Sequence, residues 1–153
     1  MANITAAAVN ELRKRTGVGM MDCKKALVEC DGDMDKAIDY LREKGQKLAA
    51  KRADRDASEG AVLATVNADK TFAAVIMMNC ETDFVAKNED FVAFTREVLQ
   101  TAVDAKAKSL EEVMALTING LSVETMIVEQ VAKIGEKITL SHYYPIEAVA
   151  TYA

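Results

Sequence analysis

Two carboxylates two positions apart, Glu81 and Asp83, are the first candidates in this sequence for metal or acid–base chemistry. Two carboxylates fall well short of the roughly six or more oxygen ligands that Ca²⁺ prefers. The single histidine, His142, would need a nucleophile and an orienting partner to act as a catalytic base. We therefore expect a partly exposed strand histidine, no metal site and no enzyme activity that breaks covalent bonds.

The motifs that hold phosphates or activate nucleophiles are absent from the sequence. It contains no GxxxxGK(S/T) phosphate loop, and no GxSxG, HExxH or GxGxxG motif. Because the phosphate loop is how many GTPases cradle their nucleotide, we expect no direct nucleotide binding and no cofactor.

The sequence has three cysteines, Cys23, Cys30 and Cys80, and an odd number cannot pair completely within one chain. The spacing of Cys23 and Cys30 can place both on one helix face, but no CxxC or histidine spacing accompanies them, so zinc is not expected. Free, reduced thiols are the predicted state.

The most informative segment runs from Asn79 to Asn88, where Phe84 follows Asp83 between two predicted elements. The apolar run 72–78 predicts a strand, and an amphipathic helix is expected to begin near Asn88. Connecting turns lie at the surface, so Phe84 either folds back under its own helix or is offered to a partner. Taken alone, the segment favours the buried alternative.

A second segment, 12–27, contains the adjacent pair Met20 and Met21. A helix cannot turn two consecutive side chains inward. Steps of three and four residues place Met20 on one core stripe with Cys23, Leu27 and Cys30. The other methionine then faces out, where its flexible side chain adapts to a partner groove. The alternative is that both are partly buried in a small core.

Both segments, together with Val131–Ile138, resemble in order and spacing the motifs of the elongation factor Ts family, over essentially the whole chain. The resemblance implies a guanine nucleotide exchange factor for the GTPase elongation factor Tu. It further implies that an N-terminal module of ubiquitin-associated type docks on the GTPase, and that a wedge intrudes near its Mg²⁺ and phosphate site. The residues implied are Thr82, Asp83, Phe84 and Val85 in the wedge, and Arg13, Val18, Gly19, Met20, Met21 and Lys24 in the module.

The net charge of −5 argues against a nucleic-acid-binding protein, which pairs phosphates with Lys and Arg. A locally basic run in 46–58 allows a weaker alternative, an RNA-binding accessory protein, although nearby acidic residues favour a solvated connector. A second alternative is a non-catalytic adaptor that binds partners through its N-terminal module.

Three short helices are predicted in residues 1–45. Thr5 is expected to cap the first, Gly17 to end it, and a second to run from about Met20 to Cys30. Asp33 is expected to cap the third, which is predicted to end at Gly45. Residues 46–58 are then a charged connector.

Residues 59–153 are predicted to form an α+β core, with a small, mainly antiparallel sheet covered by helices on one face. A hairpin is expected around the polar loop 67–70, then helices at 89–105, from Ser109 to Leu116 and from about Val123 to Lys133. A third strand is expected before Pro145. The predicted fold class is therefore α+β, with an N-terminal three-helix bundle followed in the sequence by this core.

The sequence has no apolar run long enough to span a membrane and no signal-peptide pattern, so a cytoplasmic location is expected. Longer members of the family continue into a second core subdomain, and residues 149–152 look like the start of a further strand. Short members form homodimers, and an exposed strand edge would favour self-association, so the resemblance also allows a homodimer here.

Overall fold

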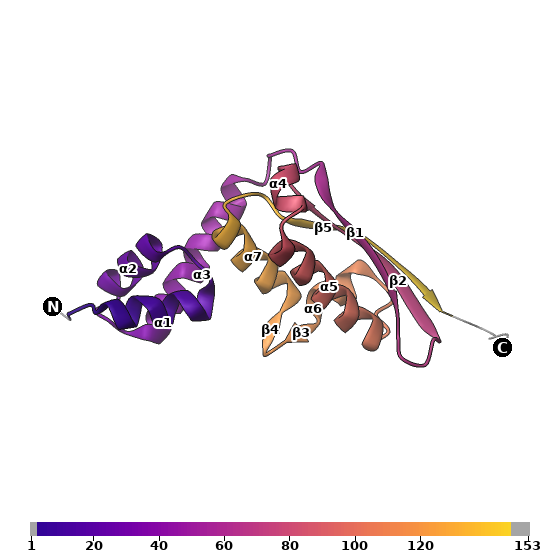
Figure 1. Ribbon diagram of the computed structural model, residues 1–153, viewed down its shortest axis with the longest axis horizontal. Helices are drawn as coiled ribbons and strands as arrows, with labels where there is room; N and C mark the ends of the chain where they lie inside the picture. The colour runs from indigo at the N-terminus through magenta and orange to yellow at the C-terminus, as the bar shows by residue number, and fades with distance from the viewer. Residues whose placement is uncertain (1–2, 148–153) are drawn as a thin grey trace. The chain divides into compact units, whose positions relative to one another are not determined.

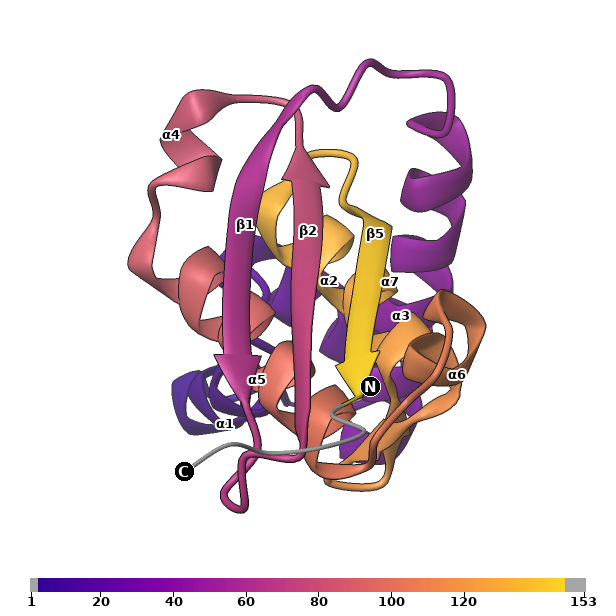
Figure 2. The same ribbon diagram turned by 90° about the vertical axis from the view of Figure 1, so that its right-hand side faces the viewer.

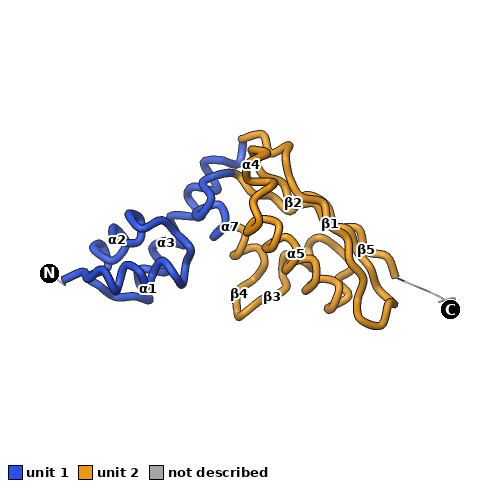
Figure 3. The backbone as a smooth tube through the Cα atoms, viewed as in Figure 1, with its two compact units in different colours: residues 1–54, 128–136 blue, residues 55–127, 137–153 orange. Residues whose placement is uncertain are grey.

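The computed structural model describes residues 3–147 of the chain. These residues form two compact units, which Figure 3 distinguishes by colour. Unit 1 contains the described residues of 1–54 together with 128–136, and unit 2 contains those of 55–127 together with the remainder. A late segment of the chain therefore belongs to the compact unit built mainly from the first helices.

Unit 1 begins with three helices that pack against one another, α1 (Ala6–Thr16), α2 (Met20–Glu29) and α3 (Met34–Lys51) (Figure 1). The Thr5 hydroxyl accepts a hydrogen bond from the Ala8 amide at 3.1 Å and caps α1. Gly17 ends this helix at a φ of 70°, in the left-handed region that glycine adopts without a Cβ clash. Asp33 caps α3 through the Lys36 amide at 3.1 Å. The three predicted N-terminal helices are confirmed.

The core of the three helices differs from the predicted stripe at the start of α2. Cys23, Ala26 and Leu27 are buried, whereas Met20 is half exposed. Met20 occupies the first position of α2, one helical turn before the first buried residue, Cys23. The assignment of Met20 to the core stripe is therefore wrong. The buried cluster comprises Val9, Leu12, Val18, Cys23, Ala26, Leu27, Ala37 and Leu41.

Gly45 does not end the third helix, which continues to Lys51 and takes in the first part of the predicted connector. Gly45 is buried in α3, and a Cβ placed on it would lie 3.0 Å from Cβ of Ala132 and 3.3 Å from the carbonyl oxygen of Val128. Both neighbours belong to α7 (Val123–Ile134). The glycine therefore permits a close helix–helix approach, and the prediction of a helix end at Gly45 is wrong.

Unit 2 is built on an antiparallel sheet whose strands lie in the order β1 (Glu59–Val66), β2 (Phe72–Cys80), β5 (Thr139–Glu147). Ile76 of the central strand pairs with Leu63 on one side and with Tyr143 on the other. Figure 2 shows the three strands in front of α5 (Glu89–Asp104), which contacts β1 and β2. The α+β class with a small antiparallel sheet is confirmed.

One face of α5 is buried, and it packs toward the alternate residues of β2 that are also buried. The buried residues of this layer include Phe91, Phe94, Val98 and Ala102 on the helix, and Phe72, Ala74, Ile76, Met78 and Cys80 on the strand. The opposite face of the sheet carries exposed apolar side chains, and within the described part of unit 2 no helix covers it. We call this the outer face; it includes Val62, Val66, Tyr144 and Ile146.

Two details of unit 2 differ from the sequence prediction. β5 continues through Pro145 to Glu147, because β5 is an edge strand and a proline there need not donate a ladder hydrogen bond. Asn119 and Gly120, which lie between two predicted helices, form a tight hairpin turn with φ values of 52° and 83°. The turn joins β3 (Thr117–Ile118) to β4 (Leu121–Ser122), after α6 (Leu110–Ala115). The strand predicted at 149–152 lies outside the described residues.

Candidate partner-binding surfaces

Phe84 lies at the surface on a single helical turn, α4 (Asp83–Ala86), between β2 and α5. Its side chain is 83% exposed. The alternative in which Phe84 folds back under its own helix is therefore wrong for the unbound chain. An exposed aromatic ring gains little within its own fold.

Residues adjacent in sequence fix the turn that carries Phe84 through hydrogen bonds. The Thr82 hydroxyl accepts a hydrogen bond from the Val85 amide at 3.3 Å and caps α4. The Cys80 thiol, at the buried end of β2, donates to the Thr82 carbonyl at 3.2 Å. Val85 is partly buried, and α4 contacts both β1 and β2. The helical turn that carries Phe84 is thus anchored to the sheet.

A distant segment of the chain also fixes this turn. The Glu81 carboxylate accepts a hydrogen bond from the backbone amide of Lys137 at 2.7 Å, and the Lys137 ammonium donates to the Arg55 carbonyl at 3.2 Å. Glu81 is therefore engaged in positioning the backbone.

Asp83 is more than half exposed and lies 3.7 Å from the ammonium of Lys87 one turn later. It is the first residue of α4, where a carboxylate is favoured by the helix dipole. Glu81 and Asp83 have different partners. Asp83 is the carboxylate presented beside the Phe84 ring.

A second exposed apolar surface lies at the start of α2. Met20 and Met21 are 50% and 79% exposed. They line an open groove of about 360 Å³ together with residues of α1 and Lys24. We call it the methionine groove; its lining is completed by Ile4, Thr5, Ala6, Val9 and Asn10. Both methionines are exposed, so the alternative in which both are partly buried is wrong.

The loop between α1 and α2 leads directly into Met20 and is held by hydrogen bonds of Val18. Val18 is buried; its amide donates to the Thr16 hydroxyl at 3.3 Å, and its carbonyl accepts from the Cys23 thiol at 3.4 Å. Val18 therefore positions the loop, and its side chain is not a contact surface in the unbound chain. Gly19 precedes α2 and is exposed. Arg13 and Lys24 are exposed, and Lys24 lines the methionine groove.

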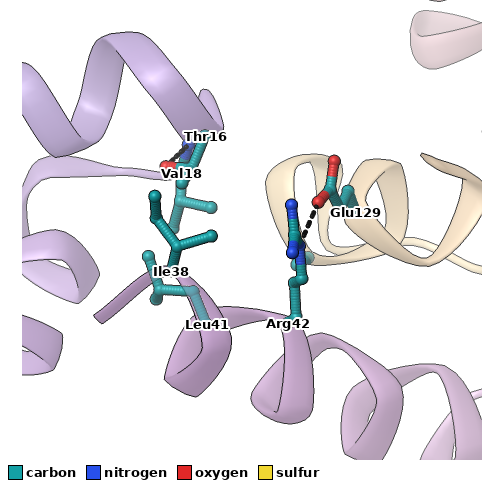
Figure 4. A pocket seen from close by; sticks show the side chains of 7 residues that line it. Thr16, Val18, Ile38, Leu41, Arg42 and Glu129 are labelled. Atoms are coloured by element: carbon teal, nitrogen blue, oxygen red, sulfur yellow. Dashed lines mark hydrogen bonds and ion pairs between the residues drawn. The ribbon is translucent and has the colours of Figure 1, made fainter. Parts of the chain in front are cut away.

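Residues 128–134 of α7 pack against the three N-terminal helices within unit 1. Figure 4 shows Arg42 of α3 reaching Glu129 of α7, with Nε and Oε1 2.8 Å apart. A Cβ on Gly17 would lie 3.0 Å from Cδ of Lys133, so the Lys133 side chain lies against the loop. The sequence prediction did not include Lys133, because its sequence separation from the loop conceals this proximity; the only signal was the match over 131–138.

The cysteines are free thiols, with Cys23 and Cys80 buried and Cys30 partly buried. Burial raises the pKa of the Cys23 thiol, and the negative charge of Asp22 adds to the effect. Across residues 3–147 there is no group of three or more His, Cys, Asp or Glu side chains that could hold a metal ion. No helix in the same range is long and apolar enough to cross a membrane.

His142 is exposed on β5, as expected, with Nδ1 3.0 Å from the Ser141 hydroxyl oxygen. That hydroxyl donates its hydrogen bond to the side-chain oxygen of Asn79.

Comparison with known proteins extends over nearly the whole chain. The family described as Elongation factor TS matches residues 81–153, and the one described as Elongation factor Ts, mitochondrial, N-terminal matches residues 1–49. An elongation factor Ts of Christiangramia forsetii is 55% identical over 97% of this chain and 53% of its own length. Those of Flavobacterium johnsoniae and Rhodopirellula baltica are 53% and 52% identical, each over 96% of this chain and 45% and 44% of their own lengths.

The chain thus spans about half the length of the curated relatives it matches. The matched ranges include both candidate surfaces, the methionine groove in the N-terminal match and Phe84 in the other. This chain belongs to the elongation factor Ts family of translation elongation factors.

Proposed function

We propose that this chain binds the GTPase elongation factor Tu and promotes release of its GDP, as a guanine nucleotide exchange factor. The observation that carries the proposal is the 83% exposed Phe84 on an anchored helical turn. Membership of the elongation factor Ts family supports it.

The proposed mechanism is a coupling between two binding events. A GTPase that holds GDP with nanomolar affinity stores about 12 kcal/mol of binding free energy. An exchange factor must bind the nucleotide-free or Mg²⁺-free state better than the GDP state, and GDP binding is then weakened by the same factor. No covalent bond breaks, so this mechanism requires no catalytic groups from the chain.

Phe84 and Asp83 fit the roles that this coupling requires. Phe84 buries its ring only when a pocket opens in the GTPase, a gain of about 1.5–3 kcal/mol for a large apolar side chain. Asp83, exposed beside it, accepts hydrogen bonds from donors on the partner and places negative charge near the Mg²⁺ site. Thr82 and Val85 hold the turn in place. The wedge therefore favours the open state.

The methionine groove is proposed as the docking surface, in a module of ubiquitin-associated type. Met20 and Met21 provide adaptable apolar contact, and Arg13 and Lys24 meet an acidic surface of the GTPase. Interactions that are equal in the open and closed states give affinity but shift no population. Docking then holds the partner while the wedge promotes release. The location proposed for this reaction is the cytoplasm.

The proposal is tested by measuring the release of a fluorescent GDP from elongation factor Tu at increasing concentrations of this chain. We expect the rate of release to rise and then saturate, and no GDP to bind to the chain alone. An adaptor would bind the GTPase without accelerating release. Saturable binding with an unchanged release rate would therefore reject the exchange mechanism in favour of the adaptor.

We also propose that a second copy of this chain covers the outer face of the sheet. Its exposed side chains Val62, Val66, Tyr144 and Ile146 form an apolar surface on paired strands, and two such faces can pack at about 10 Å as in a β-sandwich. Sedimentation should detect a dimer that Tyr144→Lys with Ile146→Lys disrupts. A wild-type monomer at high concentration would contradict the proposal.

A further inference from the structure

The methionines of this chain differ sharply in exposure. Among those at positions 3–147, only Met20 and Met21 are exposed, and they are adjacent in the methionine groove. The others are partly or fully buried; they are Met34, Met77, Met78, Met114 and Met126. Two accessible thioethers therefore stand together at the surface proposed for docking.

Accessible thioethers are the methionines that peroxides oxidise first. Hydrogen peroxide transfers one oxygen atom to the sulfur: the O–O bond breaks, an S–O bond forms, the sulfur loses two electrons, and the peroxide leaves as water. The product is a sulfoxide, which is polar, chiral and a strong hydrogen-bond acceptor. Thiol-dependent methionine sulfoxide reductases reverse the step, forming the thioether, water and a disulfide from two thiols.

The competing thiols are protected in this structure. Cys23 and Cys80 are buried, and Cys30 is partly buried. Burial raises the pKa of both Cys23 and Cys30, so little of the reactive thiolate forms at these positions near neutral pH. Among the sulfur atoms at positions 3–147, those of Met20 and Met21 are the most accessible to peroxide.

Oxidation at this pair leaves the fold in place. Neither Met20 nor Met21 belongs to the buried cluster of the three-helix module, and neither side chain makes a hydrogen bond that a sulfoxide would displace. In the bound state, by contrast, each sulfoxide oxygen would have to give up water to enter an apolar contact. The modification therefore acts on binding rather than on folding.

We infer that Met20 and Met21 form a peroxide-sensitive modification site whose oxidation to sulfoxides releases the docking surface from its partner. The loss of docking rests on the proposed function; the order of oxidation does not. The affinity of the fully oxidised pair for the GTPase is expected to fall about tenfold, equivalent to about 1.4 kcal/mol.

The experiment treats the full chain with graded hydrogen peroxide and maps the added oxygen atoms by peptide mass spectrometry. Met20 and Met21 should be modified before the five other methionines of residues 3–147. Modification of Met34 or Met77 at the same dose would overturn the site. Affinity for elongation factor Tu and the thermal midpoint are measured on the same samples.

Two variants make the result specific. In Met20→Leu with Met21→Leu, peroxide should leave the variant's own affinity unaltered, because leucine cannot be oxidised. Met114→Leu, in unit 2, should respond to peroxide like the wild type. Equal affinity of the oxidised and reduced wild-type chains would overturn the switch. If the reduced wild type does not bind the GTPase, the proposed function fails and the switch with it, whereas the peptide map still decides the modification site.

Discussion

Replacing Phe84 with alanine separates the exchange step from binding. In the unbound chain the ring is 83% exposed, so its removal takes little apolar surface out of the fold. In a partner pocket the same ring would gain about 1.5–3 kcal/mol. A loss of about 2 kcal/mol that falls wholly on the transition to the open GTPase slows GDP release about 30-fold.

The stability of the free chain provides the internal control. Phe84→Ala should leave the free energy of unfolding nearly unchanged, because the side chain makes no buried contact to lose. Phe91→Ala is the matched contrast in the same unit: that ring is 1% exposed, and truncating a buried phenylalanine costs about 3–5 kcal/mol. A large loss of stability in Phe84→Ala would show that the ring is a structural residue.

The assay is stopped-flow release of a fluorescent GDP at saturating chain, where differences in affinity no longer affect the rate. Phe84→Leu, which keeps an apolar side chain, should fall between the wild type and Phe84→Ala. Asp83→Ala should slow release in the same direction, and more weakly if its main role is to orient the turn. A wild-type rate for Phe84→Ala at saturation would refute the wedge.

Three further predictions concern other parts of the molecule. Met20→Ala with Met21→Ala should weaken binding to elongation factor Tu by tenfold or more, about 1.4 kcal/mol, with little change in thermal midpoint; a collapse of stability with unchanged affinity would make the pair core residues. Gly45→Ala should lower the free energy of unfolding by about 1 kcal/mol, since the contact 3.0 Å from Cβ of Ala132 outweighs the gain in helix propensity; a raised thermal midpoint would contradict the close approach. The hydroxyl and backbone amide of Thr71 donate hydrogen bonds to the Asp69 carboxylate and lower its pKa below the ordinary 3.8. The stabilisation from this charge is therefore present above pH 3.8 and is lost as the pH falls through the lower folded value. The difference in thermal midpoint between the wild type and Asp69→Ala should accordingly be larger at pH 7 than at pH 3, and an equal difference would show that the Asp69 charge does not contribute.

Local rules account for most of the elements. Capping by Thr5, Asp33 and Asn88 is visible in the sequence because side-chain oxygens satisfy the first free amides of a helix. The buried stripe of α5 follows from its helical period, and the strands of unit 2 from their alternation. The hairpin at Asn119 and Gly120 was also within reach, since this dipeptide is a strong signal for a two-residue turn.

Glycine and proline gave the wrong boundaries where tertiary context changes their meaning. Gly45 has the sequence signature of a helix end, yet it lies inside α3 because Ala132 approaches too closely for a side chain. Pro145 would end a central strand, but β5 is at the edge of the sheet. Neither the close approach of Ala132 nor the edge position of β5 can be inferred from residues adjacent in sequence.

The same distinction between local sequence and tertiary context applies to the candidate surfaces. The sequence by itself identified the candidate residues for partner contact, from the types and order of the residues around Phe84 and Met20. It also predicted the three-helix start and the α+β remainder. Only the tertiary structure decided which of them are presented. Burial is settled by whichever residues distant in sequence pack against a side chain, so the structure alone exposed Phe84 and both methionines, buried Val18, and brought Glu81 to Lys137.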